Sequence, residues 1–386
     1  MDTIGIGLIG TGGRLRGVLK SVLANDERFR VVSAYDPSAD SLAALESMLG
    51  YEVPACGHYR DVAQDPAVQY VMIGSWNCFH AEQVIATLEA GKPLFCEKPV
   101  ATTFADALAM ARAQQAAKLP LTIGFTLRYS PFYRALKELL AGGRIGSIVS
   151  MEFNETLDFN HGGYIHGDWR RLRANAGTHL LEKCCHDVDL VNWMLESRAA
   201  RVASFGGTDF FTPENVHHQE RIGPNPKTGK PAFQSWPHRD QDPPNPFLAD
   251  KDIIDNQVAI VQFANGVRTT FHTNCASAIP ERRMYICGSE GSIRADVITG
   301  KIEIARIGWD QAIETLEPGA KGGHGGGDGI LAGEVAASIL HGTPPSSTLA
   351  DGLQSAVTCF GIDQALDEGR VVDMADYWRQ LDAATS

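Results

Sequence analysis

The sequence predicts an α/β protein of two domains: a doubly wound parallel sheet, then an α+β domain on a large, mostly antiparallel, open sheet. Three observations support this fold class. The chain has 386 residues, more than one compact core usually holds. Apolar strand-like runs alternate with helical stretches over residues 1–125, which is typical of a parallel sheet. Closely spaced strand-like runs over residues 256–297 are typical of an antiparallel sheet.

Composition narrows the class of protein. The formal net charge is −12, so no basic field would neutralise phosphates, and no nucleic-acid partner is expected. No apolar run has membrane-spanning length, and the N-terminus has no signal-peptide pattern, so no membrane partner is expected. The eight cysteines form no C-x-x-C pair, which favours a reduced, cytoplasmic protein. No metal site is expected, because the adjacent His217 and His218 would chelate poorly.

The first strand-like run leads into a glycine turn and a helix. Gly10 permits a tight turn, and Gly12 lets a pyrophosphate approach the backbone at the positive end of the helix. Leu15 stands where the common G-x-G-x-x-G pattern has its third glycine, so Gly13 and Gly17 are expected to relieve helix packing instead. This pattern predicts a dinucleotide site.

The second strand, residues 29–35, ends in Asp36. An acid at this spacing after the glycine turn usually binds the ribose hydroxyls of the cofactor. It would repel a 2′-phosphate, so NAD is favoured over NADP. The alternative is an Asx-turn over residues 36–38, and both interpretations can hold together.

Two further strand ends should face the ligand crevice of a parallel sheet. The strand at 68–73 leads to Trp76, Asn77 and His80, which could contact cofactor. The alternatives are that Asn77 or His80 caps the helix that starts near His80 and that Trp76 is simply a buried aromatic residue. The strand at 94–96 leads into Glu97-Lys98-Pro99, where the proline holds Lys98 near the extended region. This predicts a fixed ammonium group at the mouth of the site. The alternative is a surface lysine before a loop.

Two segments of the second half carry candidate substrate groups. Residues 162–173 read as a loop whose aromatic and charged side chains suit a sugar or polyol, although an ordinary exposed loop is an equal alternative. Residues 177–195 read as a helix with an apolar stripe on one face. Glu182, His186 and Asp189 share another face, where the carboxylates would favour the charged imidazole and fix its tautomer. That arrangement suits a general base, and the alternative is a surface ion pair.

The motifs resemble the Gfo/Idh/MocA oxidoreductases, relatives of glucose–fructose oxidoreductase and inositol dehydrogenase. The marks are the glycine turn, Asp36, Asn77-x-x-His80, Glu97-Lys98-Pro99 and the run at 124–129. The resemblance implies an NAD-binding Rossmann domain at 1–125 and a substrate-binding and oligomerisation domain at 126–386. The last helix, at 351–367, is expected to pack back on the first domain.

The family has an Asp-x-x-x-His-x-x-Asp pattern, which implies that His186 accepts the proton beside Lys98. Here Glu182 replaces the first aspartate and Lys183 adds a cation. The expected catalytic residues are Lys98, His186 and Glu182. The expected cofactor-binding residues are Gly10, Gly12, Gly13, Arg14, Leu15, Asp36, Ser75, Trp76, Asn77, His80, Glu97 and Lys98. The expected substrate-binding residues are Arg128, Tyr164, Asp168, Trp169, Arg170, Lys183 and Asp189.

These features predict an NAD(H)-dependent dehydrogenase that oxidises a hydroxyl of a sugar, glycoside or cyclic polyol. One alternative is a glycoside-cleaving enzyme that uses NAD for transient oxidation and elimination, and another is a non-catalytic NAD-binding sensor. The resemblance also implies a homodimer or homotetramer formed through the C-terminal sheet. A Pro-rich insertion at 212–247 reads as a structured loop or lid of unassigned role.

Overall fold

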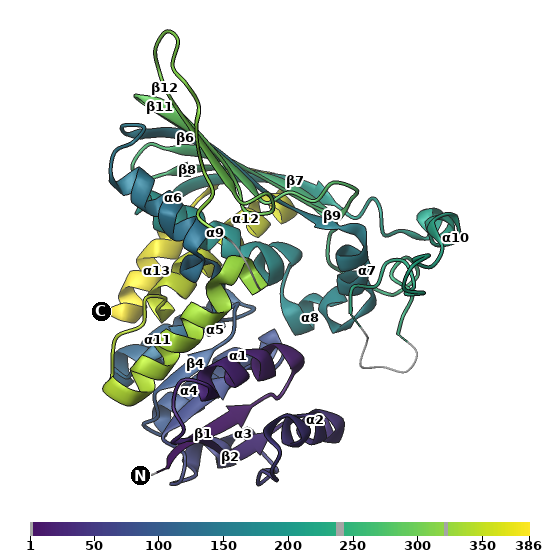
Figure 1. Ribbon diagram of the computed structural model, residues 1–386, viewed down its shortest axis with the longest axis vertical. Helices are drawn as coiled ribbons and strands as arrows, with labels where there is room; N and C mark the ends of the chain where they lie inside the picture. Colours follow the sequence, from purple (N-terminus) through teal and green to yellow (C-terminus); the bar gives the residue numbers. More distant parts are fainter. Residues whose placement is uncertain (1–2, 237–242, 320–322) are drawn as a thin grey trace. The chain divides into compact units, whose positions relative to one another are not determined.

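The chain forms two compact units (Figure 1). The computed structural model describes residues 3–236, 243–319 and 323–386. The first unit comprises Met1–Pro131, Ala320–Val357 and Tyr377–Ser386, and the second comprises Phe132–Gly319 and Thr358–Asp376. Domain limits of 1–125 and 126–386 remain a proposal. Three helices contain residues of both units: α6 (Pro131–Ala141), α12 (Leu349–Glu368) and α13 (Ala375–Thr385).

The first unit is built on a parallel sheet of five strands in the order β2-β1-β3-β4-β5, as the alternating pattern predicts. The strands are β1 (Ile4–Ile9), β2 (Phe29–Tyr35), β3 (Tyr70–Ile73), β4 (Leu94–Cys96) and β5 (Leu121–Ile123). The helices are α1 (Gly13–Leu23), α2 (Ala39–Leu49), α3 (Tyr59–Gln64), α4 (His80–Glu89), α5 (Phe104–Ala117) and α11 (Gly327–His341). All of β3 and β4 is buried, because helices cover both faces of a doubly wound sheet.

The second unit is built on a nine-stranded sheet in the order β13-β12-β11-β10-β6-β9-β8-β7-β14. Its strands are β6 (Ile148–Asp158), β7 (Ala199–Gly207), β8 (Asn256–Phe263), β9 (Arg268–Ser277), β10 (Arg283–Gly288), β11 (Gly291–Asp296), β12 (Lys301–Arg306), β13 (Glu314–Leu316) and β14 (Val372–Asp373). Only the β6–β9 pair is parallel among these described strands. The predicted mostly antiparallel sheet is therefore confirmed.

One face of this large sheet is covered and the other is open. Helix α9 (Cys185–Leu195) contacts β6 and lies along one face (Figure 1). Side chains in β8 alternate between buried and exposed, as expected for a sheet with one covered face. Phe205 pairs in register with Val258 on the open face, and both are exposed with their neighbour Ile260. An apolar patch therefore lies on the open face.

The prediction of a loop at 162–173 is wrong for most of its length. Residues Phe159–Gly167 form the helix α7, and Trp169–Arg171 form a 3-10 helix. Asp158 caps this helix by accepting a hydrogen bond from the backbone N–H of Asn160 at 2.9 Å. A Cβ atom on Gly162 would lie 1.7 Å from the carbonyl oxygen of Cys275, and one on Gly163 would lie 2.4 Å from Cβ of Phe233. The glycines allow close helix packing and do not mark a loop.

The Pro-rich insertion at 212–247 is folded wherever the structure describes it, and its residues 237–242 lie outside the described part. It contains the helix α10 (His217–Ile222). Phe233 and Phe247 of the insertion pack with Phe211, Leu157 and other buried residues into a separate hydrophobic cluster. Among the described helices, none is long and apolar enough to cross a membrane.

Candidate cofactor and substrate sites

The turn between β1 and α1 needs its first glycine. Gly10 has a φ of +77°, and a Cβ atom there would lie 2.5 Å from the backbone nitrogen of Ser75. Gly12 is the N-cap of α1 and has no side chain that could cap the first N–H groups of the helix. Such an N-terminus favours a phosphate group. This backbone fits the pyrophosphate of a dinucleotide.

Asp36 at the end of β2 holds this turn. Its Oδ2 accepts hydrogen bonds from the backbone N–H of Thr11 at 2.7 Å and from the Thr11 hydroxyl at 3.1 Å. Its Oδ1 accepts from the backbone N–H of Ser38 at 2.9 Å, which confirms the Asx-turn alternative. A carboxylate has several acceptor sites, so these bonds leave capacity for ribose hydroxyls. The ribose role of Asp36 stays a prediction.

Gly74 performs the packing role expected of Gly13 and Gly17. That expectation is wrong, because a Cβ atom on either Gly13 or Gly17 would meet no described atom within 4 Å. Leu15 is buried, and a Cβ atom on Gly74 would lie 2.7 Å from Cβ of Leu15. The glycine that relieves crowding between helix and sheet is thus Gly74, directly after β3. It faces Leu15, so α1 can have a leucine where the common pattern has its third glycine.

We expect Gly74→Ala to destabilise the protein by about 1–3 kcal/mol and to weaken NAD binding, because the added methyl group displaces Leu15 and α1. Leu15→Gly/Gly74→Ala moves the glycine to the usual third position. It should lose less stability than the sum of the two single variants, as judged by thermal unfolding. Simple additivity would contradict the packing role of Gly74.

Glu97, at the end of β4, is buried and fixed by Arg14 of α1. Nε of Arg14 lies 2.8 Å from Oε1 of Glu97, and Nη1 lies 2.6 Å from Oδ1 of Asp328. Nη2 of Arg14 donates to the Thr126 hydroxyl at 2.7 Å. Arg14 therefore joins the ends of β4 and β5 to α11. This network fixes the backbone next to Lys98, whereas cofactor contacts of Arg14 and Glu97 stay predictions.

His80 connects two of the strand-end loops. It is buried, with Nδ1 at 2.7 Å from the carbonyl oxygen of Pro99 and Nε2 at 3.2 Å from that of Ser75. Burial lowers the pKa of His80. The Ser75 hydroxyl donates to Oε1 of Gln83 at 2.6 Å. His80 thus positions the segment that carries Lys98.

The remaining first-unit residues predicted at a ligand site differ in burial. Asn77 is buried and Trp76 is exposed at the start of the same segment. Arg128 is buried, with Nη1 at 2.9 Å from Oδ1 of Asp351 in α12. This ion pair joins the end of β5 to the first part of α12 within the first unit. Substrate binding by Arg128 stays a prediction.

The helix that carries His186 differs from the expected continuous α-helix. A π-helical turn, Leu180–Cys184, precedes α9. It adds a residue to the turn, which breaks the expected α-helical spacing from Glu182 to His186. His186 and Asp189 are both buried, so the alternative of a surface ion pair is wrong. Glu182 as the group that orients His186 stays a prediction.

Arg170 is the centre of a charged group in the second unit. Its Nη1 lies 2.7 Å from Oδ2 of Asp168, and its Nε lies 3.1 Å from Oε1 of Glu182. Burial opposes the charge of Arg170, but Glu182 and Asp168 raise its pKa. The guanidinium also lies 4.4 Å from the ring centre of Trp169 and 5.9 Å from that of Tyr164. These predicted substrate-binding residues therefore lie together.

A second charged group surrounds Arg282, a residue that no sequence motif indicates. Its Nη2 lies 2.7 Å from Oδ2 of Asp187, and its Nη1 lies 3.0 Å from Oε1 of Glu155. Lys183 lies 3.4 Å from the same Glu155 oxygen. Burial opposes ionisation of Glu155, but Arg282 and Lys183 lower its pKa. Burial raises the pKa of Asp187 despite Arg282.

Glu155 and Asp187 also lie with Cys184 in a group whose potential ligand atoms are all within 4.8 Å of one another. Arg282 already supplies positive charge to both carboxylates. A cation there would have to displace or oppose the guanidinium. The described residues of this group are therefore better explained as a buried ion-pair network.

His161 and Trp236 are two further residues at this site that the pattern did not indicate. Their ring centres are 4.9 Å apart, and the Trp236 ring centre lies 5.2 Å from that of Tyr164. Burial and the charge of Lys183 lower the pKa of His161 to about 3, so its imidazole is neutral at physiological pH. Trp236 belongs to the insertion, whose contact with α7 could not be inferred from spacing.

Comparison with known proteins identifies the family. Residues 4–125 match the model of an oxidoreductase family with an NAD-binding Rossmann fold, and residues 133–294 match the GFO/IDH/MocA C-terminal domain. The chain belongs to the Gfo/Idh/MocA family. It is an oxidoreductase with an NAD-binding Rossmann domain, which confirms the expected enzyme class and cofactor.

The names of individual relatives of this Gfo/Idh/MocA chain indicate that those relatives act on small hydroxylated molecules. It is 32% identical over 198 residues to inositol 2-dehydrogenase of Gluconacetobacter diazotrophicus, with 50% of this chain and 55% of the relative covered. The chain thus spans about half the length of that relative. It is 28% identical over 276 residues to 1,5-anhydro-D-fructose reductase of Ensifer adhaerens, with 70% of each covered.

A solved structure of levoglucosan dehydrogenase with NADH and levoglucosan shares the fold of this Gfo/Idh/MocA chain. Its TM-score is 0.77 at 22% identity, with 97% of this chain and 100% of the other covered. At that identity the likeness concerns the fold alone.

Proposed function

We propose that this protein is an NAD(H)-dependent dehydrogenase that oxidises a hydroxyl group of a sugar, glycoside or cyclic polyol. The observation that carries the substrate class is the group of Tyr164, Asp168, Trp169 and Arg170 in the second unit. Aromatic faces pack against the C–H groups of a sugar ring, while charged side chains hydrogen-bond its hydroxyls. The named activities of the relatives support the same class.

The residues of the first unit fit NAD. Gly10 and Gly12 admit the pyrophosphate, and Asp36 binds the adenine ribose and disfavours a 2′-phosphate, so NAD is preferred over NADP. Bound NAD would accept the hydride from the carbon that is oxidised. Trp76 and Asn77 complete the cofactor site in this proposal.

Lys98 and His186 supply the acid–base chemistry in this proposal. The Lys98 ammonium binds the reacting hydroxyl and stabilises the negative charge that develops on its oxygen. His186 removes the proton from that hydroxyl as the C–H bond breaks. Glu182 or Asp189 orients the imidazole. The Arg14–Glu97 pair and His80 hold the backbone on both sides of Lys98.

The experiment that tests the proposed function is a screen for NADH formation, with NAD and then NADP, over inositols, aldoses, anhydrosugars and simple glycosides. NADH formed with one of these classes, and more slowly with NADP, is the expected result. No NADH with any of them, under conditions in which NAD binds, would contradict the proposal.

His186→Ala is expected to lower kcat by about 10²–10⁴, because the proton acceptor is lost. Added imidazole should restore part of the activity, and the fall in kcat/KM toward acidic pH should disappear. His341→Ala, which removes an exposed histidine at the end of α11, is the matched control. A variant of His186 with an unchanged pH–rate profile would refute its role as base.

A second candidate is cleavage of a glycoside by transient oxidation and elimination. It is favoured by two further proton-transfer groups near Arg170, Tyr164 and His161, and by Lys183, whose charge acts on His161. Elimination needs an additional acid–base step beyond the oxidation. In the screen above, this candidate predicts that a glycoside is consumed without net NADH.

Two broader proposals follow from the fold. The apolar patch of Phe205, Val258 and Ile260 supports a homodimer or homotetramer formed through the open face of the nine-stranded sheet.

The second of these proposals concerns location. All eight cysteines are free, which supports a cytoplasmic location.

A further inference from the structure

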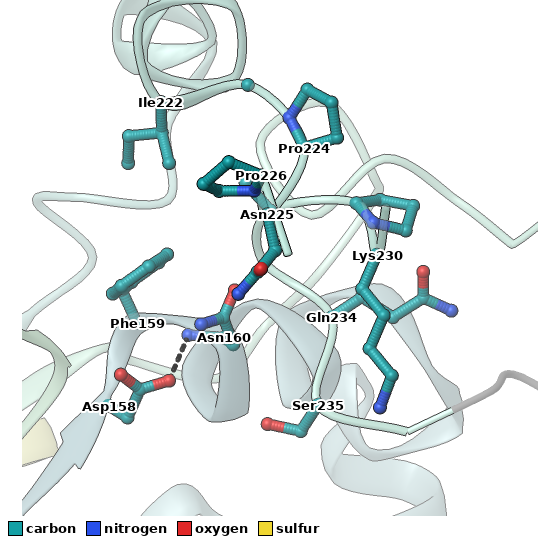
Figure 2. Close-up of a pocket in the computed structure, with 13 residues that line it drawn as sticks. Asp158, Phe159, Asn160, Ile222, Pro224, Asn225, Pro226, Lys230, Gln234 and Ser235 are labelled. Carbon is teal, nitrogen blue, oxygen red and sulfur yellow. Dashed lines mark hydrogen bonds between the residues drawn. The ribbon is translucent and has the colours of Figure 1, made fainter. Parts of the chain in front are cut away.

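A cavity of about 400 Å³ lies in the second unit between the start of α7 and the insertion (Figure 2). Its lining comes from residues 158–160 and from residues 222–235. The proposed dehydrogenase chemistry makes no use of it. Its volume falls in the range of about 300–1,000 Å³ that is typical of small-molecule sites.

The walls of this cavity are fixed by the packing beneath them. The backbone N–H of Phe233 donates to Oδ1 of Asn160 at 2.8 Å, which joins the insertion to α7. The Phe233 side chain is buried in the hydrophobic cluster and approaches α7 where Gly163 leaves room. Pro224, Pro226 and Pro231 line the cavity and restrict its backbone. The cavity is therefore preformed.

The polar groups on the walls suit a neutral, hydroxylated ligand. The Gln234 amide, the Ser235 hydroxyl and the Lys230 ammonium have no hydrogen-bond partner among the described residues (Figure 2). Asp158 offers one carboxylate oxygen beyond its helix cap, and the lining contains one acidic and one basic side chain, Asp158 and Lys230. Phe159 adds an apolar ring to the lining. Donors, acceptors and an aromatic face together are the chemistry of a carbohydrate site.

The same two segments join the cavity to the charged group around Arg170. In α7, Asn160 lines the cavity, and the next residue, His161, packs on Trp236. In the insertion, Ser235 lines the cavity, and Trp236 follows it directly. The Trp236 side chain is 52% exposed, although its ring also packs on Tyr164. The exposed Trp236 ring therefore contacts two side chains of α7 and belongs to the residue that directly follows the cavity lining.

We propose that this cavity is a second sugar subsite, so that the substrate is a glycoside of two rings. The ring that reacts binds at the group around Arg170, the second ring binds in the cavity, and Trp236 packs against the link between them. This inference rests on the proposed function for the reacting ring. It assigns the insertion a role in substrate selection.

Calorimetric titration of the protein with NAD present tests the proposal. The probes are disaccharides of glucose, galactose and mannose, each paired with the methyl glycoside of one ring. Wild-type protein is expected to bind at least one disaccharide about tenfold more tightly than its methyl glycoside. Gln234→Ala/Ser235→Ala should reduce that ratio about five- to tenfold, because two hydrogen bonds are lost. Trp236→Ala should reduce it similarly.

Two controls share the chemistry of these changes but lie outside the cavity. Trp309→Ala removes a tryptophan that is 94% exposed on the same unit, and Lys227→Ala removes an exposed lysine of the insertion. Neither should change the ratio. Equal affinity for the paired sugars in wild-type protein, an unchanged ratio in the Gln234→Ala/Ser235→Ala variant, or no binding of any disaccharide would overturn the proposal.

NADH formation, measured on the same sugars, separates this inference from the proposed function. A disaccharide that binds with the expected ratio but yields no NADH would support the subsite and contradict the dehydrogenase. NADH from methyl glycosides without any preference for a disaccharide would support the dehydrogenase and contradict the subsite.

Discussion

Lys98→Ala is expected to lower kcat by about 10²–10⁴ while the dissociation constant for NAD changes by less than about tenfold. The lysine lies two residues after β4, and its neighbour Glu97 is buried and paired with Arg14. His80 holds the carbonyl oxygen of Pro99 on the other side. Because the backbone is fixed on both sides, the loss of the ammonium group should leave the cofactor-binding turn intact.

Steady-state kinetics and an NAD titration by fluorescence measure the two quantities separately. Lys20→Ala, which removes an exposed lysine near the end of α1, is the matched control and should change neither. Turnover near the wild-type rate in Lys98→Ala would remove this lysine from the mechanism. Loss of NAD binding together with loss of turnover would make Lys98 a cofactor ligand instead.

Arg282→Met is expected to reduce the free energy of unfolding by about 3–5 kcal/mol. The Arg282 side chain is 12% exposed and neutralises two buried carboxylates, Glu155 and Asp187. Methionine fills similar space but leaves those two charges without their guanidinium. Chemical denaturation of wild-type and variant protein gives the difference. The matched control is Arg294→Met, since Arg294 pairs with Glu303 at 2.6 Å on the surface and should cost less than about 1 kcal/mol.

The loss of unfolding free energy in the Arg282→Met variant should depend on pH. Without the guanidinium, the folded-state pKa of Glu155 should rise above its unfolded value, and that of Asp187, which burial already raises in the wild-type protein, should rise further. A group of this kind contributes stability below the unfolded pKa and loses it as pH rises through the folded pKa. The deficit should therefore grow from about pH 4 to about pH 8. The triple variant Glu155→Gln/Asp187→Asn/Arg282→Met should recover most of the lost free energy of unfolding. A loss that does not depend on pH would contradict this explanation.

The parallel sheet could be predicted because its signals are local. Each buried strand is a short apolar run followed by a helical stretch, and each cofactor segment follows a strand end. The Asx-turn at Asp36 was also evident from three adjacent residues. Local patterns of this kind depend little on the rest of the chain.

Features that depend on contacts between distant segments could not be predicted. Gly162 and Gly163 suggested a loop, but they lie within α7 because Cys275 and Phe233 pack directly on them. Gly74 replaces the third glycine of the turn because it faces Leu15 across the helix–sheet contact. Spacing along the chain contains no information about either partner.

The charged groups of the second unit show the same limit. Arg170 and Glu182 were each candidates, yet their pairing depends on the π-helical turn before α9. Arg282, which directly precedes β10, pairs with Glu155 of β6 and Asp187 of α9. Trp236 reaches Tyr164 only because the insertion folds onto α7. In each case the tertiary fold brings together residues whose pairing no motif indicates.

The most direct measurement of the central claim follows deuterium from the carbinol carbon of whichever substrate the screen identifies. A dehydrogenase transfers that deuterium to NAD, so labelled reduced cofactor should be released in proportion to the oxidised product. If the substrate is consumed while its sugar product retains the deuterium and no labelled cofactor is released, net dehydrogenation is contradicted and cleavage by transient oxidation is favoured.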